Sequence, residues 1–206
     1  MIGIINYGLN NITSVKNCLD RLNIKYKVIS NIKDFNSKEI LGYILPGVGS
    51  FGRAVDRLKK IKLFHKIKLE VKKKKIPILG ICLGMQLLSK FSEENGLYEG
   101  LGLIPGCVKK IKVNRKLKIP HVGWNNIFIN KKKPILENID KLNSFYFVHS
   151  FSFRCDQKYI SSTTSYGCKI ISSVQNKHIF GVQFHPEKSQ KNGEKIINNF
   201  IKYCYK

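Results

Sequence analysis

Hydrophobic positions in the first half of the chain alternate between short continuous runs and stripes at helical spacing. Residues 2–6 form an apolar run of the length expected for a buried strand, and apolar side chains recur at helical spacing over residues 13–22. The further strands predicted in this half are 25–29, 42–45 and 76–81, and the further helices are 51–60, 63–74 and 85–91. Continuous apolar strands that alternate with helices indicate a parallel sheet covered on both faces.

The second half of the chain has a different pattern, dominated by short β-like runs. These predicted runs are 107–113, 124–129, 144–153, 159–166, 169–175 and 179–184. A final helix is expected at 191–203, where apolar residues form one stripe. Because no linker, repeat or low-complexity segment interrupts the pattern, we expect one α/β domain over residues 1–206. Its predicted core is an open, mostly parallel central sheet flanked by helices.

The composition is that of a globular protein without membrane or export signals. Hydrophobic residues make up 43% and charged residues 24% of the 206 positions, enough apolar area to offset the entropy of ordering. The longest apolar run, 76–85, contains Pro77, Gly80 and Gly84 and falls short of the roughly 20 apolar residues that span a bilayer. No basic region precedes the apolar start of the chain, as it would in a signal peptide. The sequence therefore predicts a cytoplasmic protein.

The strongly basic charge admits a nucleic-acid-binding module as an alternative. The chain has 37 Lys and Arg against 13 Asp and Glu, a formal net charge of +24. Only five of these cations are arginines, the residue whose planar fork suits phosphates and bases. The lysines are spread along all segments and accompany abundant Asn and Ile, as in a genome rich in A and T. We interpret the charge as compositional and expect no nucleic-acid partner.

Cysteine and histidine spacing argues against a metal centre. The six cysteines lie at 18, 82, 107, 155, 168 and 204. None forms a Cys-x-x-Cys pair and the five histidines do not group with them, so neither a metal nor another cofactor is predicted. Most of these cysteines are expected to be small buried apolar residues.

Cys82 is the exception, because its surroundings are typical of a nucleophile. The pentapeptide 80–84, Gly-Ile-Cys-Leu-Gly, lies where the most apolar strand meets a helix. A sharp strand-to-helix turn lifts one side chain above a sheet, and flanking glycines allow its unusual torsions. The amides at the start of the following helix favour a thiolate. A buried structural cysteine between packing glycines is the alternative that the pentapeptide alone leaves open.

A general base for this cysteine is offered by His185, just after the apolar run 179–184. Pro186 favours an extended conformation at His185, and residues i and i+2 of an extended segment point to the same side. Glu187 can therefore orient the imidazole that accepts the proton of Cys82. A surface turn is the alternative, but both motifs lie at strand ends, where α/β sheets place their sites. His121 and His149 are rival bases that lack a carboxylate two residues on.

These motifs, with Met85 and Gln86 after the elbow, resemble the Cys-His-Glu triad of class I glutamine amidotransferases. Within that class, the chain is similar to the glutaminase subunits of imidazole glycerol phosphate synthases. The matching stretches are Tyr7-Gly8, Asn11, Ser14-Val15, residues 46–51, 100–104, 120–125, 147–150 and 185–189. They run in order from residue 2 to the last helix without large insertions. Asn6 and Asn10 depart from the pattern, which usually has an acidic residue and a glycine there.

The resemblance implies hydrolysis of L-glutamine to glutamate and ammonia. Cys82 would attack the side-chain amide and form a glutamyl thioester, while His185, held by Glu187, protonates ammonia and activates water. The backbone amides of Val48 and Leu83 match the family's oxyanion-hole donors. A peptide flanked by glycines can turn its N–H toward or away from the site at low cost. The substrate-binding residues implied are Gly47, Gly49, Gln86, His149, Ser150 and Phe151.

The resemblance also implies a partner. Such glutaminases form a heterodimer with a (β/α)₈-barrel cyclase, which receives ammonia through a channel. The cyclase makes imidazole glycerol phosphate and an aminoimidazole carboxamide ribotide in histidine biosynthesis. Asn11, Trp124 and Lys188 match interface positions, although a core role for Trp124 is an equal alternative. A paralogous glutaminase that feeds a related barrel enzyme for amidino-sugar synthesis remains a further alternative.

Overall fold

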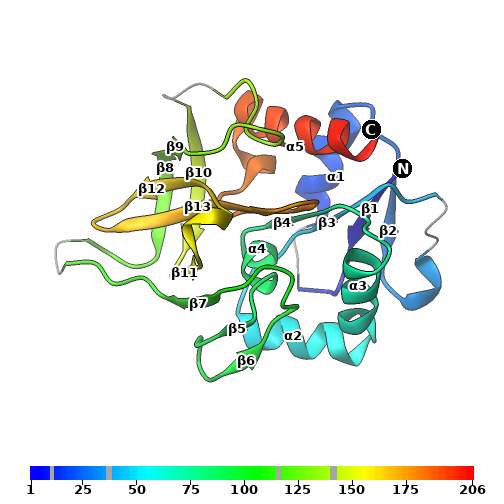
Figure 1. The fold of residues 1–206 in the computed structure, drawn as a ribbon, viewed down its shortest axis with the longest axis horizontal. Coiled ribbons are helices and arrows are strands. Elements are labelled where there is room, and N and C mark those ends of the chain that lie inside the picture. Colours follow the sequence, from blue (N-terminus) through cyan, green and yellow to red (C-terminus); the bar gives the residue numbers. More distant parts are fainter. Residues whose placement is uncertain (10–11, 36–38, 115–116, 140–142) are drawn as a thin grey trace.

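The central sheet has eight strands, of which the five on one side run parallel (Figure 1). The computed structural model describes residues 1–9, 12–35, 39–114, 117–139 and 143–206. The strand order is β2 (Tyr26–Ile29), β1 (Ile2–Ile5), β3 (Gly42–Leu45), β4 (Ile78–Ile81), β14 (Ile179–Val182), β13 (Lys169–Asn176), β12 (Ile160–Ser165) and β9 (Phe128–Ile129). Each of the last three strands, β13, β12 and β9, runs antiparallel to the strand listed before it. The predicted open, mostly parallel sheet flanked by helices is confirmed.

Helices cover both faces of this sheet (Figure 1). The five α-helices of the described residues are α1 (Ile12–Arg21), α2 (Phe51–Lys60), α3 (Leu63–Lys72), α4 (Leu83–Leu87) and α5 (Gln190–Cys204). Helices α1 and α5 pack into one apolar cluster, and α2, α3 and α4 pack into another. Strands β1, β3, β4 and β14 have four residues each, and all of these residues are buried, as expected for continuous apolar runs. Among the described residues, no helix is long and apolar enough to cross a membrane.

Two smaller sheets and three short 3₁₀ helices complete the described fold. One sheet pairs β10 (Ser144–His149) with β8 (His121–Asn126), and the other has the order β11 (Phe151–Arg154), β7 (Cys107–Lys110), β5 (Phe91–Ser92) and β6 (Tyr98–Glu99). The 3₁₀ helices are η1 (Ile32–Asp34), η2 (Gln157–Tyr159) and η3 (Pro186–Lys188). The predicted run 144–153 is thus two strands, which belong to different sheets and part at Ser150.

Two further predictions of element bounds are wrong. The predicted strand 124–129 begins earlier, at His121, and divides into β8 and β9. The predicted helix 85–91 begins at Leu83 and ends at Leu87, after which the chain forms β5. The helix stops because the loop 100–104 turns back onto it: the N–H groups of this loop donate to the carbonyls of Leu87 and Leu88.

Candidate active site

Cys82 occupies a strained turn between β4 and α4. Its φ of 53° and ψ of −111° lie outside the regions that a residue with a side chain normally adopts. The turn is fixed on both sides, because the Cys82 N–H donates to the Val182 carbonyl at 2.8 Å and the Cys82 carbonyl accepts from the Gln86 N–H at 3.2 Å. This is the strand-to-helix elbow that the sequence predicts, with the sulfur raised at the carboxyl end of β4.

Glycines let the backbones around the elbow touch. A Cβ on Gly84 would lie 1.7 Å from the Leu45 carbonyl oxygen, and a Cβ on Gly80 would lie 2.5 Å from the Gly84 oxygen. Helix α4 therefore rests directly on strands β3 and β4. A similar contact supports the segment that carries the predicted base, since a Cβ on Gly193 of α5 would lie 1.7 Å from the Pro186 oxygen.

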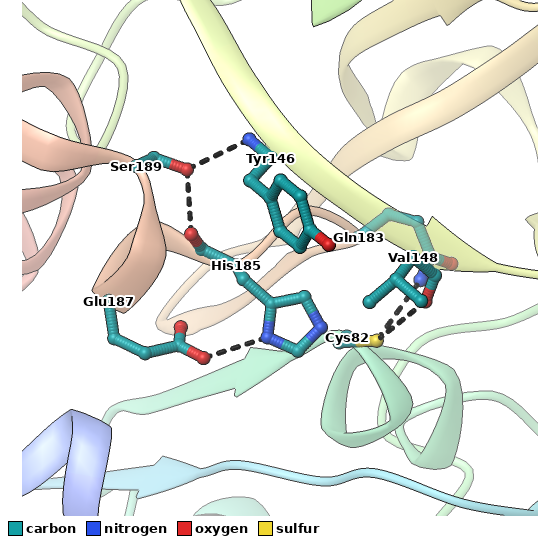
Figure 2. A network of polar contacts seen from close by, with 7 residues as sticks. All are labelled: Cys82, Tyr146, Val148, Gln183, His185, Glu187 and Ser189. Carbon is teal, nitrogen blue, oxygen red and sulfur yellow. Dashed lines mark hydrogen bonds and ion pairs between the residues drawn. The ribbon is translucent and has the colours of Figure 1, made fainter. Parts of the chain in front are cut away.

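His185 is held between Glu187 and Cys82. Its Nδ1 lies 2.7 Å from Glu187 Oε1, and both side chains are buried. Figure 2 shows its Nε2 turned toward the Cys82 sulfur. The His185 N–H donates to the Tyr146 carbonyl at 2.9 Å, and Ser189 Oγ donates to the His185 carbonyl at 2.6 Å. The histidine backbone is extended, with φ −97° and ψ 93°, as expected before a proline.

The charges around His185 favour its protonated form. Burial of the ring disfavours the charged form, but the Cys82 thiolate and the Glu187 carboxylate outweigh this and raise the pKa of His185 to about 10. The imidazole can therefore hold a proton that it takes from the thiol. This is the electrostatic arrangement required of a cysteine nucleophile with a paired base.

A pocket with a volume of about 340 Å³ opens over the Cys82 sulfur. Its walls contain most of the residues predicted from the sequence, namely Val48, Gly49, Cys82, Leu83, Gln86, His149, Ser150, Phe151 and His185. Gly47 lies behind this wall, where a Cβ would come within 2.4 Å of Tyr7 Oη and 3.0 Å of Leu83 Cβ. Glu187 lies behind His185. The pocket thus combines the segments that follow β3 and β14 with the start of α4 and with residues of β10 and β11.

The two predicted oxyanion donors are placed differently. Leu83 is the first residue of α4 and lines the pocket beside Cys82. The Val48 N–H instead donates to the Leu9 carbonyl, at 3.4 Å. It is therefore occupied outside the pocket in this structure. Gly49 has a φ of +92°, and a Cβ built there would meet nothing within 4 Å, so this glycine can change its torsions at low cost.

His121 and His149 form a neutral pair instead of a second base. His149 Nδ1 lies 2.8 Å from the Phe151 carbonyl oxygen, which can only accept, so Nδ1 carries the proton. His149 Nε2 then accepts from His121 Nδ1 at 3.0 Å. Burial lowers the pKa of each ring to about 4. His149 therefore lines the pocket as an uncharged group, and the lone pair on its Nε2 already accepts a hydrogen bond from His121.

Two polar residues of the site were not predicted from the sequence. Glu94 lines the pocket and accepts a hydrogen bond from the Phe51 N–H at 2.8 Å, and burial raises the pKa of its carboxyl. Gln183, fully buried, lies beside Cys82 and Gln86. It is the one polar residue in the apolar run 179–184, which is the signal that could have drawn attention to it. Glu94 lies in a polar turn that carries no such signal.

Of the residues expected to meet a partner, Trp124 and Lys188 are not among those that line the pocket over Cys82. Trp124 on β8 is 49% exposed and Val122 on the same strand is 53% exposed, which excludes a core role for the tryptophan. Lys188 is exposed, and its Nζ lies 5.8 Å from the centre of the Tyr146 ring. Asn10 and Asn11 lie outside the described residues. Asn6, the other departure, accepts from the Gly8 N–H at 3.1 Å and so supports the turn.

No cluster of His, Cys, Asp or Glu side chains suited to a metal ion occurs in the part of the chain that the structure describes. The groups around Cys82 are a thiol, an imidazole, a carboxylate and amides. Their chemistry is that of nucleophilic attack and proton transfer at a carbonyl carbon.

Comparison with known proteins agrees with this chemistry. The model of the family "Glutamine amidotransferase class-I" matches residues 3–204, and the chain belongs to this family. Solved structures of the same fold include PurLQS from Thermotoga maritima, with a TM-score of 0.75 and 19% identity over 98% of this chain and 97% of that one. The glutaminase domain of CTPS from Trypanosoma brucei has a TM-score of 0.67, with 17% identity over 99% of this chain and 93% of that one.

Within that class, the chain belongs to the imidazole glycerol phosphate synthase subunit HisH proteins. It is 44% identical to subunit HisH 1 of Campylobacter jejuni (strain RM1221), over 98% of this chain and all of that protein. It is also 44% identical to subunit HisH 2 of Methanococcus maripaludis, over 98% of this chain and 99% of the relative. The Bacillus subtilis HisH is 40% identical over 98% of this chain and 96% of its own length.

Proposed function

We propose that this chain, as a single domain, is the glutaminase subunit of an imidazole glycerol phosphate synthase. It hydrolyses L-glutamine to L-glutamate and ammonia, and a cyclase subunit uses the ammonia in histidine biosynthesis. The observation that carries the proposal is the buried line of Glu187, His185 and Cys82, of which His185 and Cys82 line the pocket. The names of its relatives support the choice of synthase.

In the proposed reaction, Cys82 Sγ attacks the carbon of the glutamine side-chain amide. The C–N bond of the tetrahedral intermediate breaks as His185 Nε2–H donates its proton to the leaving nitrogen, which releases ammonia and leaves a glutamyl thioester. His185 then takes a proton from water as the water oxygen attacks the thioester carbon. The C–S bond breaks, glutamate is released, and the Cys82 thiolate is restored. Glu187 remains ionised and holds the Nδ1–H, so that Nε2 stays directed at the reacting atoms.

The pocket walls suggest how the amino-acid end of glutamine is held. The Glu94 carboxylate can pair with the substrate ammonium, and the segment 149–151 can receive its carboxylate. Leu83 and Val48 are the proposed donors to the oxyanion. Because the Val48 N–H is bonded to Leu9, this peptide must turn before it can serve. We therefore expect a low glutaminase rate for the chain on its own.

The proposed partner is the (β/α)₈-barrel cyclase subunit, in a heterodimer. Val122 and Trp124 expose an apolar surface of the kind that anchors an interface, and Lys188 provides a charge beside it. We include Asn11 in this interface on the basis of the sequence. Lys188 directly follows Glu187, so its pairing with an acidic partner residue would link docking to the catalytic carboxylate.

The test is glutamate release from glutamine by the purified chain, alone and with the same organism's cyclase and its ribotide substrate. We expect a rise of about a hundredfold on addition of both, equal to about 2.7 kcal/mol of barrier. No stimulation, from a chain whose Cys82 still reacts with iodoacetamide, would favour the amidino-sugar paralogue and another barrel partner. Tight, steeply salt-dependent binding of nucleic acid without glutaminase activity would contradict the proposal altogether.

A further inference from the structure

The orientation of the Gln183 side chain is dictated by a hydrogen-bond chain that begins at a backbone carbonyl. The Phe151 oxygen can only accept, so the Gln86 group 3.0 Å from it is the Nε2 amide nitrogen. The same nitrogen lies 3.0 Å from Gln183, which must present its Oε1 there. The Gln183 Nε2 is then left to face the Cys82 sulfur, at 3.8 Å. Gln183 cannot be flipped without breaking its bond to Gln86.

The Cys82 sulfur therefore has neighbours of opposite hydrogen-bonding character (Figure 2). As a thiol, it donates to the Val148 carbonyl at 3.8 Å and accepts from Gln183 Nε2. As a thiolate it can no longer donate, and the Val148 oxygen then faces a negative charge. The Gln183 N–H becomes more favourable at the same moment, because hydrogen bonds to charged acceptors are stronger.

Gln183 is also held firmly enough to play this part. Its side chain is fully buried, and its backbone N–H donates to the Ser172 carbonyl at 2.8 Å. Both polar atoms of its amide are satisfied only if the Cys82 sulfur accepts, since a buried polar group without a partner is costly. The pairing of Gln183 with the sulfur is thus part of the folded structure before any substrate enters.

We propose that Gln183 is a further catalytic residue, whose amide donates a hydrogen bond to the Cys82 thiolate, and that Gln86 orients it. The inference rests on the proposed function for its role in turnover, but its effect on the sulfur does not need glutamine. It assigns Gln86 a positioning role in addition to any contact with substrate. The donor is neutral, so it favours the thiolate without competing with His185 for the proton.

The test is the pH dependence of Cys82 alkylation by iodoacetamide in the full chain, followed on the Cys82 peptide by mass spectrometry. Gln183→Met keeps a similar volume but has no donor for the sulfur. We expect the midpoint of the alkylation profile to move up by about one pH unit, with an approximately tenfold lower rate below it. The glutaminase kcat should fall by a similar factor, while KM for glutamine changes less than about threefold.

Two matched variants make the result interpretable. Gln86→Met leaves Gln183 in place but frees its amide to rotate, so we expect a smaller shift in the same direction, and this variant serves if Gln183→Met does not fold. Gln157→Met, on an exposed 3₁₀ helix, should leave the profile unchanged. A wild-type alkylation midpoint in both pocket variants would overturn the proposal. If the pocket variants shift the alkylation midpoint but the wild-type chain releases no glutamate, the role of Gln183 toward the sulfur is upheld and the proposed function is overturned.

Discussion

The two sets of groups that the proposed reaction needs are held in different ways. Cys82 stands on a turn in which backbone rests on backbone, with room at Gly80 for hydrogen alone. The turn that contains Val48 has open space at Gly49, and its N–H is bonded to Leu9 outside the pocket. The nucleophile and its base are therefore in place in the free chain, whereas one oxyanion donor is not. Such a division allows a docking partner to control the rate without touching the sulfur.

Removal of the fixed element should have the largest effect. Cys82→Ala should lower glutamate release by at least about 10⁴-fold, because no other nucleophile replaces the thiol. Synthesis from added ammonia by the complex with the cyclase should continue, since it needs no thioester. Both rates are measured on the same reconstituted complex, with Cys168→Ala as the control. Loss of the ammonia-dependent reaction as well would make Cys82 a structural residue.

Removal of the movable donor should have an intermediate effect and separate the two elements. Val48→Pro lacks the N–H, so partner-stimulated glutaminase should fall by about 10²–10³-fold. Alkylation of Cys82 needs no oxyanion hole, and its rate should stay within about twofold of the wild type. Val48→Ala, which keeps the N–H, is the control. If Val48→Pro slows alkylation as strongly as turnover, the two elements are not independent.

The proposed docking surface should influence stimulation through affinity. Trp124→Ala removes a half-exposed aromatic side chain, and an interface anchor of this kind contributes about 2 kcal/mol, or about 30-fold in affinity. The cyclase concentration for half-maximal stimulation should rise by this factor in a titration. Phe128→Ala is a matched control, because Phe128 is 61% exposed on the edge strand β9. Equal effects of the two substitutions would remove Trp124 from the interface.

The smallest effect concerns the contribution of protonated His185 to the stability of the folded chain. The pKa of His185 is raised to about 10, above the usual value of about 6.5 for an unfolded chain, so the folded state holds the proton more tightly. Its contribution to stability is complete below pH 6.5 and is lost as the pH rises toward 10. The free energy of unfolding in urea should be higher for the wild type than for His185→Gln at pH 6, and this difference should become smaller at pH 8 and pH 10. A difference that grows with pH would have the wrong sign for a thiolate–imidazolium pair.

The predictions from the sequence succeed where local pattern determines the result. Helix α2 spans residues 51–60 and strand β3 spans 42–45, as their periodicity indicates. Helix α4 could not be bounded in this way, since the loop that ends it lies more than ten residues further along the chain. The break at Ser150 likewise depends on β10 and β11 pairing with different strands, which the local pattern does not reveal.

The site divides in the same manner. Cys82, His185 and Glu187 could be found because each follows an apolar strand and their spacing carries chemical meaning. The direction of the Val48 N–H could not, because a peptide between glycines adopts either orientation at little cost. Glu94 and Gln183 were missed since their roles come from contacts with Phe51, Gln86 and Cys82, which are distant in sequence.

The close backbone contacts at Gly84 and Gly193 determine which substitutions the site can tolerate. The positions of the nucleophile and the base depend on contacts between main-chain atoms at glycines where only hydrogen fits. A surface substitution that leaves the main chain in place therefore leaves the reacting atoms in register, whereas any side chain at Gly84 or Gly193 would displace α4 or the segment that carries His185.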